Sequence, residues 1–320
     1  MNLLVTGGAG FIGSHFCNTI APAAKKLVIL DKLTYAANLN YLDCSNILVV
    51  GDICDRALVR KILYTHEIDT IVHFAAESHV DRSIQSAEAF VKTNIVGTQV
   101  LIDEFKDYNS NESTFKRFIH VSTDEVYGVA KKGTSFTELT PYAPNSPYAA
   151  SKAASDLMVR SYYKTHNLPA IITHCSNNFG PHQADEKLIP TVIRSIVNNQ
   201  YIPVYGSGKQ IRDWISVQDH CTALASVLYR GRVGETYNIG GDNEVSNIDL
   251  VHRLCDYSDE FTNTSGSRKL VQHVPDRLGH DIRYSIDSTK IIKELGWRPR
   301  RVFNSELKNT LEYYFEKYAP

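Results

Sequence analysis

Residues 2–13 read NLLVTGGAGFIG and are the most informative part of the sequence, because an apolar run, a glycine-rich turn and the start of a helical pattern follow one another directly. Gly7, Gly10 and Gly13 let the chain turn tightly and bring backbone N–H groups close to a pyrophosphate. The N-terminus of the helix that follows adds a partial positive charge aimed at the same anion. Because the glycines stand between a strand and a helix, the stretch predicts a dinucleotide-binding loop.

Short apolar runs alternate with segments of helical period through the first half of the chain. The expected strands are Asn2–Thr6, Lys26–Asp31, Ile47–Gly51, Thr70–Ala75, Arg117–Ser122 and Ala170–Cys175. The expected helices are Phe11–Ala21, Arg56–His66, Ala87–Tyr108 and Tyr148–His166. Near-continuous apolar runs are typical of parallel strands that are covered on both faces. The succession predicts an α/β fold with a doubly wound parallel (Rossmann) sheet.

The rhythm changes after about residue 178. A helix is expected at Leu188–Asn199, a turn at Tyr205–Lys209, a helix at Asn247–Tyr257 and a mobile polar loop at Asp259–Lys269. We therefore predict a mainly dinucleotide-binding domain at residues 1–178 and a smaller, mainly substrate-binding lobe at residues 179–320. Some strands and helices of the second part are expected to return to the first.

The composition excludes several classes of protein. A net charge of −1 gives no basic field for nucleic acid, and 43% hydrophobic residues are typical of a globular chain. The six cysteines have no metal-ligand spacing, so we expect no metal and a reducing compartment. No apolar run approaches the roughly 18 residues of a membrane span, and the N-terminus does not resemble a signal peptide. A cytoplasmic protein without a membrane partner is expected.

An acidic residue selects the cofactor. Asp31 ends the second expected strand, roughly 20 residues past the glycine loop, where a carboxylate binds ribose hydroxyls and repels a 2′-phosphate. The sequence therefore favours NAD over NADP, with Lys32 next to this position. Asp52 follows the third strand and is either an adenine contact or a helix-capping residue.

A tyrosine and a lysine form the first catalytic candidate. Tyr148 and Lys152 in SPYAASK share one face of a helix, since they are four residues apart. A lysine ammonium favours phenolate and lowers a tyrosine pKa that is otherwise near ~10. Tyr148 can then act as a base for a hydroxyl group, with Thr123 nearby at the end of the fifth strand.

Together, TGGAGFIG, YxxxK and STDEVYG resemble the extended short-chain dehydrogenases/reductases. Within them the chain is similar to the nucleotide-sugar 4,6-dehydratases, through segments that include HFAAESHVDRSI, SNNFGP, IRDW, YNIGG and DRLGHD. The most specific element is the pair Asp124-Glu125. Eliminating water from C5 and C6 of a 4-keto hexose needs a base and an acid, and two adjacent carboxyls with separated pKa values supply both.

The resemblance implies an internal redox cycle on dTDP-glucose or UDP-glucose that ends in a 4-keto-6-deoxy sugar. Asp124 is implied as the acid, Glu125 as the base and Thr123 as a contact near O4. Further implied cofactor contacts are Phe11, Ile12, Leu33, Thr34, Ile53, Phe74, Ala75, Ala76, Thr93 and Asn178. Implied substrate contacts are Ser78, Asn177, Lys187, Leu188, Pro203, Tyr205, Arg212, Asn238, Arg277 and His280.

Two other functions remain open. A UDP-sugar 4-epimerase or UDP-glucuronate decarboxylase shares the glycine loop and YxxxK but does not need both Asp124 and Glu125. A dinucleotide sensor without enzymatic activity has no use for the complete catalytic set. The resemblance also implies a homodimer, in which Ala87–Tyr108 and Tyr148–His166 pair with a second subunit.

Overall fold

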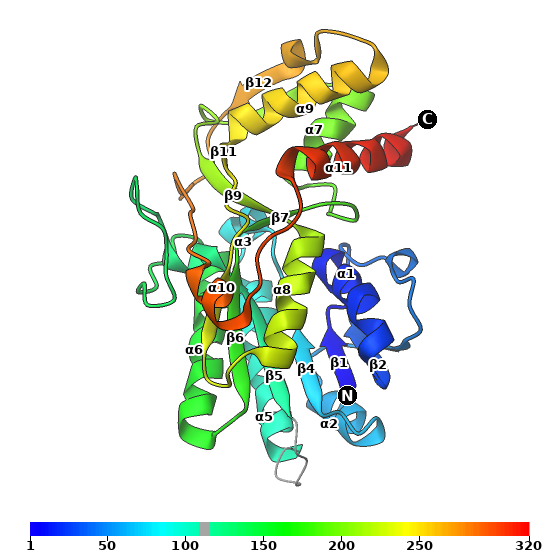
Figure 1. Cartoon of the computed structure of the whole chain (residues 1–320), viewed down its shortest axis with the longest axis vertical. Helices are drawn as coiled ribbons and strands as arrows, with labels where there is room; N and C mark the ends of the chain where they lie inside the picture. The colour runs from blue at the N-terminus through cyan, green and yellow to red at the C-terminus, as the bar shows by residue number, and fades with distance from the viewer. Residues whose placement is uncertain (109–115, 320) are drawn as a thin grey trace.

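The computed structural model describes residues 1–108 and 116–319, and its centre is a parallel sheet of seven strands in the order β10-β6-β5-β4-β1-β2-β3 (Figure 1). The strands are β1 (Asn2–Thr6), β2 (Lys26–Asp31), β3 (Ile47–Val50), β4 (Thr70–His73), β5 (Arg117–Thr123), β6 (Ala170–Cys175) and β10 (Thr236–Ile239). The predicted fold class is confirmed. The strand order reverses between β1 and β4, where doubly wound sheets bind ligands at the carboxyl ends of their strands.

Alternating side chains of the strands bury two apolar faces. Leu3 and Val5 pack with α1 (Phe11–Ile20) and α8 (Val217–Arg230) on one face. Leu4 points the other way, toward α2 (Arg56–Thr65), α5 (Thr98–Tyr108) and α6 (Pro147–His166). Helix α8 and strand β10 come from the second half of the sequence, so residue 178 is not a clean spatial boundary.

The segment expected to form one helix at Ala87–Tyr108 is interrupted. It consists of α4 (Glu88–Phe90), a π-helical stretch (Val91–Gly97) and α5, and it follows the short helix α3 (Val80–Gln85). Asn94 explains the irregular turn, because its side chain exchanges hydrogen bonds with the backbone of Glu77 and donates to Ser151 Oγ at 2.8 Å. A π turn of this kind is common near functional sites.

The second lobe lies over the carboxyl ends of the sheet (Figure 1). Its helices are α7 (Leu188–Val197), α9 (Asn247–Thr262) and α11 (Phe303–Tyr318), which share one apolar core. Its strands are β7 (Asn177–Phe179), β8 (Ile202–Tyr205), β9 (Ile211–Ser216), β11 (Glu244–Ser246) and β12 (Val271–Val274). The short helix α10 (Thr289–Leu295) returns to the sheet core.

The expectation of a loop throughout Asp259–Lys269 is wrong. Helix α9 continues to Thr262, and a 3-10 helix occupies Ser267–Leu270. Asp259 ties the two together, because its carboxylate accepts hydrogen bonds from Gly266 N at 2.8 Å and Ser267 Oγ at 2.6 Å. The polar composition therefore reflects a capping interaction.

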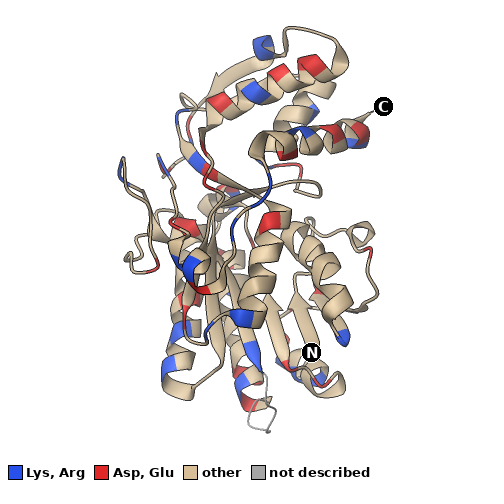
Figure 2. Ribbon diagram, viewed as in Figure 1, with Lys and Arg blue, Asp and Glu red and all other residues tan. Residues whose placement is uncertain are grey.

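Charged side chains of both signs are interspersed over both lobes (Figure 2). Within residues 1–108 and 116–319, no helix combines the length and apolarity that a membrane span requires. In the same residues, no group of three or more His, Cys, Asp or Glu side chains is arranged to hold a metal ion.

Candidate active site

A cavity of about 550 Å³ lies between the carboxyl ends of the sheet and the second lobe. This volume is in the range of small-molecule sites, which is about 300–1,000 Å³. Residues that the sequence selected line it from both lobes: Gly7, Gly10, Phe11, Ile12, Gly13, Asp31, Lys32, Thr34, Asp52, Ile53, Phe74, Ala75, Ala76, Ser78, Thr93, Thr123, Asp124, Glu125, Tyr148, Lys152, Asn177, Asn178, Lys187, Leu188, Pro203, Tyr205, Arg212, Arg277 and His280.

The glycines let the loop turn and pack tightly against neighbouring backbone, where side chains would clash. Gly7 has φ +72°, and a Cβ there would lie 2.7 Å from Ala75 N at the end of β4. A Cβ on Gly13 would overlap the Gly7 carbonyl. Helix α1 begins after Gly10, and no side chain caps it. The helix N-terminus therefore faces the cavity as an anion-binding site of the kind that a pyrophosphate needs.

Two carboxylates mark the adenosine end of the cavity. Asp31 is buried at the end of β2 and accepts hydrogen bonds from Ala9 N at 2.9 Å and Leu33 N at 2.8 Å. Lys32 Nζ lies 2.8 Å from Asp52 Oδ2. Burial opposes ionisation of Asp52, but hydrogen bonds from Lys32 and Cys54 hold its pKa below the usual value. Because Lys32 is paired, the local field disfavours a 2′-phosphate, and the site suits NAD.

The acid pair occupies a 3-10 helix, Asp124–Tyr127, directly after β5. Asp124 is 1% exposed, and its Oδ2 atom has no hydrogen-bond partner within the chain. Burial, Glu125 and Asp213 raise the pKa of Asp124 well above its usual value. Burial also raises the pKa of Glu125, while the charges of Arg212, Lys187 and Arg277 oppose that shift. The two neighbouring carboxyls thus have different environments, as an acid and a base require.

Tyr148 and Lys152 line the same part of the cavity from α6. Lys152 Nζ donates to Val121 O at 2.9 Å, and burial lowers the pKa of its ammonium. Burial, Glu125 and Cys175 raise the pKa of Tyr148 well above its usual value. The expected lowering of the Tyr148 pKa by Lys152 is therefore not found in the chain by itself, where burial raises this pKa and the group that opposes the rise is the hydroxyl of Thr123.

Lys187, Arg212 and Arg277 are the cationic side chains among the implied substrate contacts, and two of them are held by partners on the rim of the cavity. Arg277 makes a two-pronged ion pair with Asp81, with Nε–Oδ1 at 2.6 Å and Nη2–Oδ2 at 3.0 Å. Lys187, at the N-terminus of α7, donates to Ser78 O at 3.1 Å. His280 contacts Asp276 Oδ1 at 2.6 Å. These cations are preorganised at the cavity edge, where they are positioned to meet an anion.

The third cation, Arg212, is only 7% exposed and lies on β9. Its guanidinium donates to Ile211 O and to Asp281 O at 2.9 Å, and its Cζ atom lies 4.2 Å from the centre of the Tyr284 ring. A planar guanidinium held on both edges and stacked on a ring suits bidentate recognition of phosphate.

Two residues selected from the sequence do not line the cavity. Asn238 on β10 is completely buried, donates to Phe136 O at 3.0 Å and accepts from the Tyr127 hydroxyl at 2.9 Å. Its amide is therefore used inside the fold, and the substrate contact expected of Asn238 stays a prediction. Leu33 contributes its N–H to Asp31 rather than a side chain to the cavity.

Other lining residues were not selected from the sequence. Asp81 holds Arg277, Tyr284 supports Arg212, and Trp214 is 4% exposed with an indole N–H that has no partner within the chain. Asp81 and Trp214 lie inside the segments HVDRSI and IRDW that carry the resemblance, but no local pattern distinguished them. Gln183, next to Asn178, lies on a stretch without periodicity.

Comparison with known proteins places this geometry in a family. The family model described as GDP-mannose 4,6 dehydratase matches residues 4–310. A dTDP-glucose 4,6-dehydratase of Xanthomonas campestris pv. campestris (strain B100) is 48% identical over 97% of this chain and 92% of its own length. A dTDP-glucose 4,6-dehydratase of Escherichia coli K12 is 47% identical over 98% of this chain and 92% of its own length.

Solved structures give the same result. A dTDP-glucose 4,6-dehydratase of Streptomyces venezuelae with NAD bound has a TM-score of 0.92 at 46% identity, covering 99% of this chain and 97% of that one. A UDP-glucose 4-epimerase of Thermotoga maritima has a TM-score of 0.89 at 26% identity, with 99% of each chain covered. The chain therefore belongs to the nucleotide-sugar 4,6-dehydratase family of the extended short-chain dehydrogenases/reductases.

Proposed function

We propose that the chain is an NAD-dependent hydro-lyase that converts dTDP-glucose to its 4-keto-6-deoxy derivative. The observation that carries the proposal is the buried carboxyl of Asp124, whose Oδ2 atom has no partner within the chain, beside Glu125 in the same cavity as Tyr148 and Lys152. The relatives of about half identity carry the dTDP-glucose name, which favours this substrate over UDP-glucose.

Gly7, Gly10 and Gly13 would hold the pyrophosphate of NAD, and Asp31 its adenosine ribose. When bound, NAD supplies the acceptor for the hydride from C4 and the donor of the hydride to C6. Tyr148 takes the proton from the sugar O4, and the Lys152 ammonium stabilises the phenolate against the burial that otherwise raises the tyrosine pKa.

The acid pair performs the elimination. The 4-ketone acidifies the proton on C5, and Glu125 accepts that proton under the field of Arg212 and Lys187. Asp124, whose pKa burial and Glu125 raise, is protonated in the resting site and delivers its proton to the departing C6 hydroxyl. One water leaves. As hydride returns to C6, Glu125 gives its proton back to C5, which completes the methyl group and the 4-keto-6-deoxy sugar.

The experiment is incubation of the purified chain with dTDP-glucose and, separately, UDP-glucose, without external reductant. We expect a 4-keto-6-deoxy sugar, detected by its absorbance in alkali and by the loss of one water in mass spectrometry, with higher kcat/KM for dTDP-glucose. Galactose-configured product without loss of water would instead show an epimerase. An unchanged substrate together with tight NAD binding would show a sensor.

A homodimer is the proposed assembly. Val91 and Val96 on the π-helical stretch and Leu157 on α6 are 46%, 41% and 56% exposed, although these two elements pack side by side. A second copy of the same pair would cover these apolar side chains in a four-helix bundle. Sedimentation at micromolar concentration should give a dimer, and Leu157→Arg should give a monomer; a wild-type monomer would contradict the assembly.

The proposed location is the cytoplasm. All six cysteines lack a disulfide bond, which is typical of a reducing compartment. Fractionation of the producing cells tests this, and recovery of the chain outside the cytoplasm would contradict it.

A further inference from the structure

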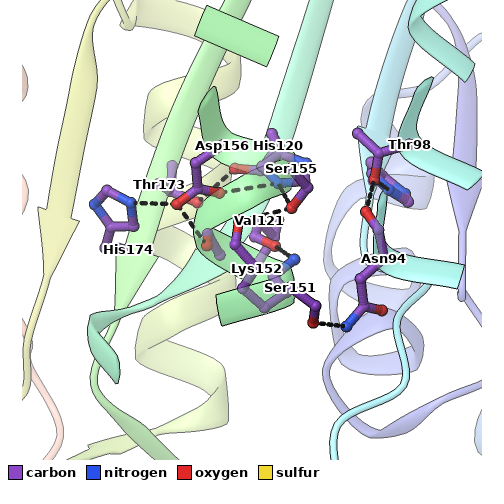
Figure 3. Close-up of polar contacts among 12 residues, drawn as sticks. Asn94, Thr98, His120, Val121, Ser151, Lys152, Ser155, Asp156, Thr173 and His174 are labelled. Atoms are coloured by element: carbon purple, nitrogen blue, oxygen red, sulfur yellow. Dashed lines mark hydrogen bonds and ion pairs between the residues drawn. The ribbon is translucent and has the colours of Figure 1, made fainter. Parts of the chain in front are cut away.

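A buried polar cluster lies below the cavity, where β5, β6 and α6 meet (Figure 3). Its centre is Asp156, which is 1% exposed. His174 Nε2 lies 2.9 Å from Asp156 Oδ2, and His120 Nε2 lies 3.1 Å from Asp156 Oδ1. Ser122 Oγ donates to Oδ2 at 3.0 Å. Of these four residues only Ser122 lines the cavity, and the proposed reaction assigns no step to any of them.

The hydrogen-bond directions around His174 establish where its protons lie. Asn238 Nδ2 donates to the carbonyl of Phe136, so Asn238 Oδ1 faces Tyr127 and must accept from its hydroxyl. The Tyr127 hydroxyl has one proton and donates it to Asn238. Its oxygen must therefore accept a hydrogen bond from His174 Nδ1 at 2.8 Å. Nε2 lies 2.9 Å from Asp156 Oδ2 and 3.0 Å from the Tyr142 hydroxyl, and because an ionised carboxylate can only accept, Nε2 donates to Asp156 as well. His174 therefore carries an N–H on both ring nitrogens.

The second histidine is different. Burial and the charge of Lys152 lower the pKa of His120 to about 4, although Asp156 opposes the shift. His120 is therefore neutral near pH 7. Asp156 and His174 form the charged pair of the cluster, and a buried charge that loses its partner is strongly destabilised.

The pair connects three catalytic segments. Asp156 lies one helical turn after Lys152 and two turns after Tyr148 on α6. Ser122, which donates to Asp156, immediately precedes Thr123-Asp124-Glu125. His174 lies on β6, just before the cavity residues that follow this strand.

We propose that Asp156, paired with a protonated His174, is a positioning residue that holds the Tyr148–Lys152 face of α6 in register with Asp124 and Glu125. The inference rests on the proposed function, in which the two groups act on adjacent carbons of one hexose. A displacement of about 1 Å between such groups costs on the order of 100-fold in rate. The pair thus fixes the relative placement of the redox and elimination halves of the site.

The protonation of His174 is tested without any substrate. Ring ¹⁵N spectra of histidine-labelled protein near pH 8, assigned by comparison with His174→Gln, should show both nitrogens of His174 in the protonated range. His120 should show one protonated and one bare nitrogen. A bare nitrogen on His174 would overturn the ion pair, whatever the enzyme proves to do.

The positioning role is tested by a double-mutant cycle of Asp156→Asn and His174→Gln. Each single variant leaves one buried charge without its partner, so we expect kcat on dTDP-glucose to fall on the order of 100-fold with KM changed less than about threefold. The double variant should lose far less than the product of the two single losses, because two neutral amides replace the pair.

Tyr142→Phe is the matched control. It removes a hydroxyl that contacts His174 Nε2 at 3.0 Å and also Asp156, but it leaves the contact between His174 and Asp156 in place, so kcat should stay near the wild-type value. Losses that multiply in the double variant, or a kcat for folded Asp156→Asn within threefold of wild type, would overturn the positioning role. Wild-type protein inactive on dTDP-glucose would instead count against the proposed function, and the nitrogen spectra would still decide the ion pair.

Discussion

Replacing Asp124 by Asn separates the elimination step from the rest of the cycle. The amide keeps the size of the carboxyl but cannot release a proton, so the C6 hydroxyl departs without an acid. General acid catalysis contributes about 10²–10⁴-fold, or about 3 to 5 kcal/mol of transition-state stabilisation. We expect kcat to fall by that factor, with KM nearly unchanged because the nucleotide is bound elsewhere.

The same substitution should not lower the stability of the protein. Folding raises the pKa of Asp124, so this carboxyl costs increasing stability as the pH rises above the pKa of the unfolded chain. Asn has no such cost. The free energy of unfolding of Asp124→Asn in urea at about pH 8 should equal or exceed that of the wild type, which excludes misfolding as the cause of lost activity.

Deuterium exchange identifies the step that is lost. In D₂O, Asp124→Asn should return substrate with deuterium at C5, because Tyr148 and Glu125 still act and only the departure of water is slow. The matched variant Glu125→Gln should return unlabelled substrate. Exchange in Glu125→Gln, or kcat within threefold of wild type for Asp124→Asn, would refute the assignment of base and acid.

Three further predictions concern the binding of cofactor and substrate. Gly7→Ala should destabilise the chain by more than about 2 kcal/mol in urea unfolding, because its Cβ would strike Ala75, whereas Gly133→Ala, also at positive φ but with nothing within 4 Å, should cost only about 1 kcal/mol. Asp31→Asn should weaken NAD binding and narrow the preference over NADP in calorimetric titrations of cofactor-free protein; an unchanged ratio would contradict its role. Arg212→Met should raise KM for dTDP-glucose on the order of 100-fold, and a loss confined to kcat would place Arg212 elsewhere.

Local sequence patterns predict much of the fold. Apolar runs bounded by turns identify six of the seven sheet strands, and Gly7 identifies a tight turn where the loop backbone approaches the chain that follows β4. Strand β10 is short, and its edge position depends on pairing with β6 from a distant part of the chain. Periodicity within four residues cannot indicate such a pairing.

The candidate site is predictable where chemistry and neighbours in sequence coincide. Two pairs of residues lie close together in the sequence, and their spacing already suggests a reaction. They are Tyr148 with Lys152 and Asp124 with Glu125. Asn238 shows the limit of prediction from residue type. An amide can bind a sugar hydroxyl or make hydrogen bonds inside the fold, and the side chain of Asn238 makes interior hydrogen bonds.

Long-range partners are the part that sequence cannot supply. Arg277 meets Asp81 across the cavity rim, and Asp156 meets His174 below it, only because the chain folds. The irregular turn at Asn94 has the same origin, because it depends on hydrogen bonds from the Asn94 side chain to Glu77 and Ser151.

Transfer of deuterium from C4 to C6 within one sugar is the most direct test of the proposed internal hydride transfer. dTDP-glucose labelled with deuterium at C4, mixed with unlabelled substrate, is incubated with the enzyme in ordinary water, and the product is analysed by mass spectrometry and NMR. We expect deuterium at C6 of the same molecules that carried it at C4, with none exchanged between molecules. Deuterium that stays at C4, or that is lost to water, would contradict it.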